Sequence, residues 1–352
     1  MINKRKFKTI VSVIVKGGIT GIIAFGFVPF LFTMESSNLS IMLVEGLITG
    51  LLFGLAESII FTKRLKKLPF SVLLIIRTLV YSIIWFWSQM IMVIILVYYG
   101  GLSISDYGSK KFIDYITAIH PELSIWVAIF ISFSVSYLWQ INSMLGKRVL
   151  IKYIRGKYHK PVLENRIFMF LDLSAATTIA EKLGAQKYSQ FLKDFFYDID
   201  GIIRDTKGEI FQYEGDGIII LWTIKNGIQN NNCVKMFFDA NRKIKGLKIK
   251  YIEKYGMSPE YKAGLHYGEV VITEIGDSKK EIVYHGDAIN TTARICSSCN
   301  ELNKKLLISS ALLQKLNLEN KYTFETMGDF KLKGKKEVIE LFSIDVLTDK
   351  EL

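Results

Sequence analysis

Apolar residues are distributed differently in the two halves of the chain. The first 145 residues contain four long apolar stretches, at about 9–33, 40–62, 69–99 and 122–145. Each stretch is long enough to cross a bilayer core of about 30 Å, which takes roughly 20 helical residues. The pattern therefore predicts a transmembrane domain of four α-helices over residues 1–145. Arg77, in the third stretch, either faces the interior of the helix bundle or extends toward the membrane surface beside the basic segment 63–67, and we expect the second.

The charged segments between these stretches predict the orientation of the domain. Residues 1–8 and 62–68 are strongly basic, whereas residues 34–39 have no basic side chain. Basic loops stay on the cytoplasmic side of a membrane, and four crossings return the chain to the side on which it began. We expect a multi-pass protein of the cytoplasmic membrane, with the lipid bilayer as a partner and both termini in the cytoplasm.

Net charge and cysteine content narrow the function classes. The chain carries a net charge of +12, but the basic residues cluster beside the apolar stretches and form no nucleic-acid-binding module, so we expect no nucleic-acid partner. Cys296 and Cys299 have C-x-x-C spacing without a second pair of ligands at zinc spacing. We interpret them as ordinary helix cysteines.

The second half of the chain has the pattern of an α+β domain. Residues 146–165 are a basic connector, and from residue 166 short apolar runs alternate with longer amphipathic segments. This pattern predicts a mixed, mainly antiparallel sheet with helices on one face. The expected strands are 166–173, a hairpin over 209–222, 261–273, 281–284, 305–309, and a closing hairpin of 322–333 and 337–344. The expected helices are 177–207, 231–255, 287–303 and 311–316.

The hairpin contains the first candidate for chemistry. Residues 211–220 read FQYEGDGIII, so Gly215-Asp216-Gly217 separates two apolar runs. Asp-Gly is a common hairpin turn, and Asp216 is therefore either a turn residue or a cation ligand. Asp172 ends the first strand, and in a βαββ arrangement a strand end and the following hairpin turn can lie side by side. Two carboxylates there suit Mg²⁺, and a two-cation site supports phosphoryl chemistry; the alternative is that Asp172 caps the next helix.

Residues 166–345 resemble the catalytic domain of class III nucleotidyl cyclases, the adenylate and guanylate cyclases. Four segments match motifs of that family in order and at suitable spacing: FLDLSAAT, YEGDGIIILW, YHGDAINTTARI and GDFKLKGKKEVIELFSI. The combination is specific, although no single motif would be. The resemblance implies a catalytic domain over 166–346 with a ferredoxin-like βαββαβ core, followed by a C-terminal tail, 347–352.

The resemblance also implies roles for individual residues. Asp172 and Asp216, with the carbonyl group of Leu173, correspond to the ligands of two Mg²⁺ or Mn²⁺ ions per site. Asn290 corresponds to the residue that orients the ribose, and Arg294 to the one that stabilises charge developing on the α-phosphate. The small residues after the first strand are expected to bind phosphate through backbone N–H groups at a helix N-terminus, and a lysine of the closing hairpin to contact the triphosphate. The expected nucleotide-binding residues outside the base pocket are Ser174, Ala175, Ala176, Thr177 and Lys333.

Two positions depart from the family pattern for reading the base. Gln212 stands where adenylate cyclases have lysine and guanylate cyclases have glutamate, and Val283 stands where Asp or Thr is frequent. Glutamine both donates and accepts hydrogen bonds, so the pair does not select one base. We expect a membrane-anchored adenylate cyclase that makes 3′,5′-cyclic AMP from ATP at composite sites of a homodimer. The alternatives are a cyclase for GTP or a pyrimidine triphosphate, and a membrane sensor that binds nucleotide without turnover.

Overall fold

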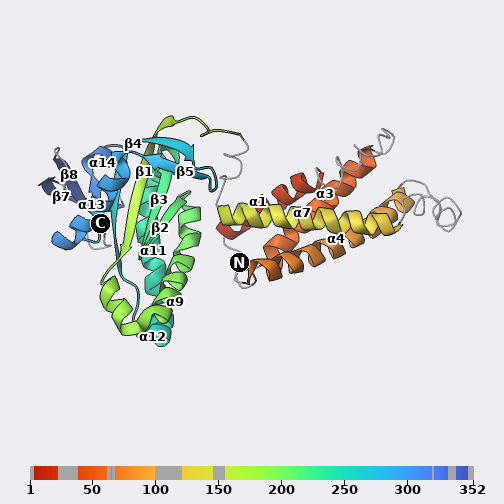
Figure 1. The fold of residues 1–352 in the computed structure, drawn as a ribbon, viewed down its shortest axis with the longest axis horizontal. Coiled ribbons are helices and arrows are strands. Elements are labelled where there is room, and N and C mark those ends of the chain that lie inside the picture. Colours follow the sequence, from red (N-terminus) through yellow and green to blue (C-terminus); the bar gives the residue numbers. More distant parts are fainter. Residues whose placement is uncertain are drawn as a thin grey trace. The chain divides into compact units, whose positions relative to one another are not determined.

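The chain divides into two compact units, Met1–Leu145 and Gly146–Leu352. The structure, a computed structural model, describes residues 4–22, 39–61, 65, 68–99, 121–145, 155–318, 321–331 and 338–347. Figure 1 shows the described helices and strands of both units. Each unit is described by itself.

The N-terminal unit consists of long helices in its described part: α1 (Lys4–Gly21), α3 (Leu39–Ile59), α4 (Phe70–Tyr99) and α7 (Pro121–Leu145). Glycine at position 17 allows α1 and α3 to pack very closely, because a Cβ atom there would overlap the carbonyl oxygen of Gly50. Within the described residues, one segment is both long and apolar enough to cross a membrane, Phe70–Ser88, with a mean hydropathy of 1.9. Helices thus occur at all four predicted stretches, but four membrane spans are not confirmed.

A buried ion pair joins α3 to α4. Arg77 Nη2 lies 2.8 Å from Glu57 Oε1, and both side chains are buried. The Arg77 guanidinium also lies 5.1 Å from the centre of the Phe61 ring, and the Tyr81 hydroxyl donates to Glu57 Oε2 at 3.4 Å. The expectation that Arg77 reaches the membrane surface is therefore wrong, and the alternative, a position in the interior of the helix bundle, is confirmed. Glu57, one helix away, supplies a carboxylate that makes the buried position tolerable.

The second unit is built on an eight-stranded sheet in its described part. The path order is β2-β3-β1-β4-β6-β8-β7, and β5 pairs with β4. The β4–β6 pair is parallel and the other pairs are antiparallel, which confirms the predicted mixed, mainly antiparallel sheet. The strands are β1 (Val162–Leu173), β2 (Glu209–Glu214), β3 (Gly217–Thr223), β4 (Tyr261–Ile275), β5 (Glu281–His285), β6 (Leu306–Ser309), β7 (Tyr322–Phe330) and β8 (Ile339–Val346).

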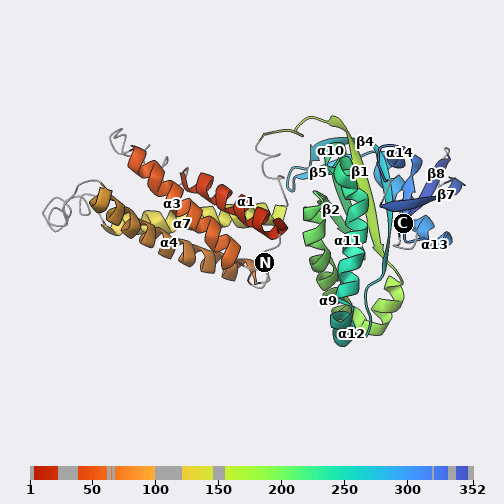
Figure 2. The same cartoon turned by 180° about the vertical axis from the view of Figure 1, so that it is seen from behind.

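Helices cover both faces of this sheet, so the expectation of helices on one face is wrong. Successive strand residues point to opposite faces: Ile167 of β1 packs in the cluster that includes α9 and α11, whereas Phe168 packs in the cluster that includes Ala288 of α13. Helix α13 reaches its face because Gly264 of β4 lacks a Cβ that would overlap the Cys296 nitrogen. The helices are α9 (Ala176–Asp205), α10 (Ile224–Ile228), α11 (Asn232–Gly246), α12 (Lys248–Tyr255), α13 (Asp287–Glu301) and α14 (Ser310–Leu313). Figure 2 shows α9 and α11 beside each other from behind.

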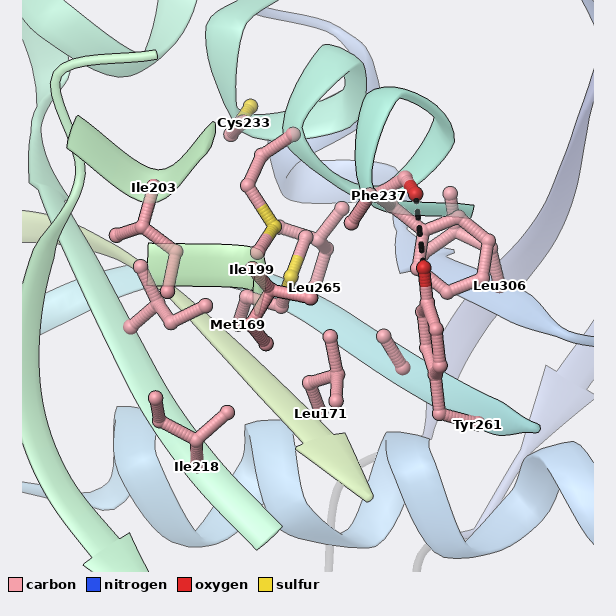
Figure 3. Close-up of a cluster of buried hydrophobic side chains, with 14 of the residues drawn as sticks. Met169, Leu171, Ile199, Ile203, Ile218, Cys233, Phe237, Tyr261, Leu265 and Leu306 are labelled. Atoms are coloured by element: carbon pink, nitrogen blue, oxygen red, sulfur yellow. Dashed lines mark hydrogen bonds between the residues drawn. The ribbon is translucent and has the colours of Figure 1, made fainter. Parts of the chain in front are cut away.

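The largest core cluster fills the space between the sheet and these two helices. Figure 3 shows Met169 and Leu171 of β1 in one cluster with Ile199 and Ile203 of α9, and Phe237 of α11 beside Tyr261 of β4. Each of these side chains is buried. Burying such a side chain contributes about 1.5–3 kcal/mol. The core therefore holds β1 firmly, and β1 in turn carries the candidate site at its C-terminal end.

Candidate active site

The register of β1 places Asp172 between two neighbours. Asp172 is paired across the sheet with Gly217 of β3 on one side and with Lys262 of β4 on the other. Its neighbours in sequence, Leu171 and Leu173, point into the core and are buried. Asp172 therefore points to the opposite face, where its carboxylate is partly exposed.

Asp216 lies directly beside this position, at the turn between β2 and β3. The two central residues of the turn are Gly215 and Asp216, not Asp216 and Gly217, because Glu214 pairs with Gly217. Gly215 has a φ of 59°, which favours glycine. Burial and the nearby charge of Asp172 raise the pKa of Asp216 above its ordinary value, against a lowering effect of a backbone hydrogen bond and of Lys262. The structure therefore brings the two predicted carboxylates together.

Lys262 belongs to this cluster and was missed from the sequence. Its Nζ lies 3.1 Å from Asp172 Oδ2. In the sequence, Lys262 is visible only as a lysine between the apolar residues Tyr261 and Ala263. Its proximity to Asp172 can be predicted only when the register of β1 and β4 is known. Tyr188 of α9 was also missed: burial and then the charges of Asp216 and Asp172 raise the pKa of its phenol. A tyrosine on an amphipathic helix gives no sequence signal.

The segment that follows Asp172 forms a tight turn into α9. Ala175 is the N-cap residue, with φ 55° and ψ 34°, and no side chain caps this helix. Asp172 therefore does not cap α9. The Ser174 N–H donates to the Glu260 carbonyl oxygen at 2.8 Å, so that group is not directed at a phosphate. The N–H groups of Ala175, Ala176 and Thr177 are left as candidates for an anion at this helix N-terminus.

Asn290 and Arg294 lie one turn apart on α13, as predicted, and so share a face of the helix. Asn290 is exposed and Arg294 is half-buried. No hydrogen bond or ion pair within the described part of this chain joins either residue to Asp172 or Asp216. Lys333 lies outside the described residues. Helix α13 covers the face of the sheet to which Asp172 points, and the charge of Asp172 acts on Cys296 of that helix.

The two predicted base-reading residues lie on strands that approach each other. Gln212 follows an irregularity in the β2–β3 register, is paired with Ile219 and is exposed. Val283 is paired with Thr273 in the β4–β5 hairpin. Their neighbours Phe211 and Tyr284 are in contact, with ring centroids 4.9 Å apart. The contact brings β2 and β5 close together, but the register turns Val283 to the face opposite Tyr284, so the structure does not place Gln212 and Val283 in one pocket.

The donors at the carboxylate pair suit a hard divalent cation. Carboxylate and carbonyl oxygens are the ligands that Mg²⁺ prefers, with water and substrate phosphates completing its shell. Burial and the charge of Asp172 raise the pKa of Asp216, so a bound cation would favour its ionised form. Within the described residues no group of three or more His, Cys, Asp or Glu side chains could hold a metal. Asp172 and Asp216 with the Leu173 carbonyl group would thus form a partial shell that a nucleotide completes.

Cys296 and Cys299 are buried on α13. A hydrogen bond with Cys299, and burial, raise the pKa of the Cys296 thiol. Protonated, buried thiols are poor nucleophiles and poor metal ligands. Both residues accordingly pack as ordinary helix cysteines.

Comparisons with known proteins match this architecture. Residues 159–345 match the family model described as adenylate and guanylate cyclase catalytic domain. The chain is 32% identical over 228 residues to Adenylate cyclase 2 of Rhizobium meliloti (strain 1021), covering 64% of this chain and 63% of that protein. It is 26% identical over 205 residues to the receptor-type guanylate cyclase gcy-7 of Caenorhabditis elegans, covering 56% of this chain and 18% of that protein. The chain thus spans less than two thirds of either relative's length.

The fold is similar to that of a solved structure of a bacterial light-regulated adenylyl cyclase. The TM-score is 0.53 at 21% sequence identity, and the match covers 66% of this chain and 65% of that chain. At this identity the likeness concerns the fold alone.

Proposed function

From the premise that this chain belongs to the family of adenylate and guanylate cyclase catalytic domains, we propose that it converts ATP to 3′,5′-cyclic AMP and pyrophosphate. The observation that carries the proposal is the pair of carboxylates, Asp172 and Asp216, held side by side by the β1–β3 register. The relative named Adenylate cyclase 2 supports ATP as the substrate.

In the proposed reaction the ribose 3′-oxygen forms a bond to the α-phosphorus, and the bond from that phosphorus to the β-phosphate oxygen breaks. The hydroxyl proton leaves to water or to a substrate phosphate. Two bound Mg²⁺ or Mn²⁺ ions would polarise the reacting oxygens and neutralise phosphate charge. Asp172, Asp216 and the Leu173 carbonyl group would hold these ions.

In this proposal, Asn290 and Arg294 of α13 (the α13 pair) contact the ribose and the α-phosphate of the nucleotide. The Arg294 guanidinium matches the geometry of phosphate oxygens and would stabilise charge that develops on the α-phosphate. Asn290, one turn earlier, would hold the ribose in the orientation for attack. As the resemblance to class III nucleotidyl cyclases implies, we propose that a homodimer forms composite sites, with one copy supplying the carboxylate pair and the other the α13 pair.

The side chain at the base-reading position of β2 is the reason for a second candidate substrate. Gln212 is exposed and lies close in space to the β5 strand that carries Val283. Because an amide matches donor–acceptor patterns of several bases, turnover of GTP or a pyrimidine triphosphate is the alternative. A non-catalytic nucleotide sensor is the alternative from a different class.

We further propose that the N-terminal unit anchors the protein in the cytoplasmic membrane, with the catalytic unit in the cytoplasm. Large apolar side chains face outward from its helices, among them Ile75, Leu79 and Trp87 of α4 and Trp126 and Phe130 of α7. An outward-facing apolar surface of this kind is unfavourable in water and favourable in hydrocarbon. Protease added to sealed inverted vesicles should digest the catalytic unit; its protection there would contradict the orientation.

The test of the activity uses the full chain purified in detergent with Mn²⁺ and each of the four nucleoside triphosphates in turn. We expect cyclic AMP and pyrophosphate from ATP, and none from the Asp172→Asn variant. Product from GTP, CTP or UTP in place of ATP would establish the alternative substrate. Binding of a nucleotide without pyrophosphate release would establish the sensor.

A further inference from the structure

Lys262 is the ion-pair partner of Asp172, one of the two carboxylates proposed to hold the cations. The two residues face each other directly across β1 and β4, and the Lys262 Nζ approaches Asp172 Oδ2 to 3.1 Å. The lysine side chain is 12% exposed and the aspartate side chain 25% exposed. This is a shielded ion pair, and not one of the solvated pairs at the surface.

The ammonium group and a divalent cation compete for the same carboxylate. An oxygen of Asp172 that is ion-paired with Lys262 already faces a positive charge, and a cation bound beside it would be repelled by that charge. Lys262 also lowers the pKa of Asp216, although burial and Asp172 together outweigh it. Its charge therefore partly balances both carboxylates in the chain without nucleotide.

The lysine can change partners more easily than the carboxylates can. Its ammonium is a point charge on a flexible four-carbon stem, whereas Asp172 lies in a strand paired on both edges. A triphosphate bound at this site brings several negative charges close to Lys262. The stem can then move the ammonium from the carboxylate to a phosphate without any change in the sheet.

We propose that Lys262 is a positioning residue that occupies Asp172 in the absence of nucleotide and releases it when a triphosphate binds. The inference rests on the proposed cyclase function, and it deepens that function. Its consequence is cooperative binding: nucleotide raises the affinity for the divalent cation, and the cation raises the affinity for nucleotide by the same factor. Free cation alone binds poorly, because it must displace the lysine.

The experiment measures Mn²⁺ binding by electron paramagnetic resonance on the full chain in detergent, with and without a non-hydrolysable ATP analogue. Lys262→Met removes the charge and keeps the length of the side chain. We expect this variant to bind Mn²⁺ alone about five- to tenfold more tightly than the unsubstituted protein. The enhancement of Mn²⁺ affinity by the analogue should fall by about the same factor.

Two variants serve as matched controls. Lys305→Met makes the same charge change at the exposed Lys305–Glu260 pair, and it should leave Mn²⁺ affinity unchanged. Lys262→Arg keeps the charge and should retain weak binding of free Mn²⁺. Circular dichroism spectra matching that of the unsubstituted chain show that each variant is folded.

The outcomes separate this inference from the proposed function. If Lys262→Met binds free Mn²⁺ no more tightly than the unsubstituted chain, Lys262 is only a structural partner of Asp172 and the inference is wrong. If Asp172→Asn leaves Mn²⁺ binding intact, the cation does not bind at this carboxylate and the proposed metal site itself is wrong. If Lys262→Met does not fold, Lys262→Gln in the same titration gives the answer.

Discussion

At the scale of single residues, Ala175 combines an unfavourable backbone with a position next to the candidate site. It is the N-cap of α9 and adopts a left-handed conformation, with φ 55°. An L-residue with a Cβ is strained there by about 1–2 kcal/mol, whereas glycine is not. The strain is localised between Asp172 and the first turn of α9, where the candidate phosphate-binding N–H groups lie.

The Ala175→Gly substitution should therefore stabilise the protein. We expect the free energy of unfolding to rise by about 0.5–1 kcal/mol, because relief of the strain exceeds the added entropy of the unfolded chain. The urea midpoint, followed by circular dichroism, measures the change. Ala176→Gly is the matched control: Ala176 begins the helix, and glycine there should destabilise by up to about 1 kcal/mol. Equal loss of stability in both variants would contradict the interpretation.

The sequence predicted the site residues that belong to recognisable motifs. It did not predict residues whose role depends on a partner from another strand or helix. Asp172 and Asp216 could be predicted to lie together because a strand end and a hairpin turn meet in this topology, and the structure brings them together. Lys262 could not, because its partner is far away in sequence. Glu57 was missed for the same reason, and Arg77 was therefore assigned to the membrane surface instead of to a buried pair.

At the scale of elements, two acidic residues of α9 accept hydrogen bonds from α12 and so hold the two helices together. Asp194 accepts hydrogen bonds from Lys254 at 2.6 Å and from Tyr255 at 2.9 Å. One helical turn later, Asp198 accepts from Lys250 and Tyr251, each at 2.9 Å. The repeated arrangement fixes α12 along α9. Burial raises the pKa of the Asp194 carboxyl, but the hydrogen bonds from Lys254 and Tyr255 outweigh burial and lower it below its ordinary value.

Asp194→Asn should weaken this attachment in a pH-dependent way. At pH 7 we expect the free energy of unfolding to fall by about 1 kcal/mol, since Lys254 is half exposed and its charge is screened by solvent. Because the folded pKa is lowered, the stabilisation by Asp194 is fully present above the ordinary aspartate pKa of about 3.9. It is lost as the pH falls through the folded pKa.

Urea titrations of both proteins from pH 7 to pH 3 check this expectation. The difference in stability should stay constant down to about pH 5 and shrink at lower pH. Glu260→Gln, at the exposed Lys305–Glu260 pair, should change stability by less than about 0.5 kcal/mol at any of these pH values. A difference for Asp194→Asn that grows on acidification would exclude the proposed ion pair as its cause.

Elements were predicted better than their arrangement. The segment predicted as the first strand, 166–173, begins earlier in the structure, at Val162, and β4 extends to Ile275 instead of 273. These ends depend on pairing with neighbours, which apolar periodicity does not report. The same limit explains why α13 was not predicted to cover the second face of the sheet. Gly264 allows α13 to pack closely on β4, but in the sequence it is only a glycine within an apolar strand.

At the scale of the whole molecule, the proposed homodimer predicts complementation between two inactive variants. Asp172→Ala removes one half of a composite site, and Arg294→Ala removes the other half. A mixed dimer then contains one site with both defects and one intact site. Co-expressed variants should regain up to about half of the specific activity per mixed dimer, whereas each variant alone should lose about 10²-fold or more.

Differently tagged copies, purified in two steps, isolate the mixed dimer for this measurement of cyclic AMP formation. Asp172→Ala combined with Arg294→Ala in one copy, paired with an unsubstituted copy, is the control. That dimer holds one defect in each of its two sites and should remain inactive. Activity in the control together with inactivity of the mixed dimer would show that each site lies within one chain.

Because β1 is paired along both edges, it also sets where the chain tolerates a change in length. One residue inserted into β1 would turn Asp172 toward the core and move its partners from Gly217 and Lys262 to other residues. An insertion in the exposed segment 276–280, between β4 and β5, would leave both pairings unchanged. We therefore expect a short peptide tag inserted in that loop to leave the carboxylate pair in place, and a one-residue insertion in β1 to separate it.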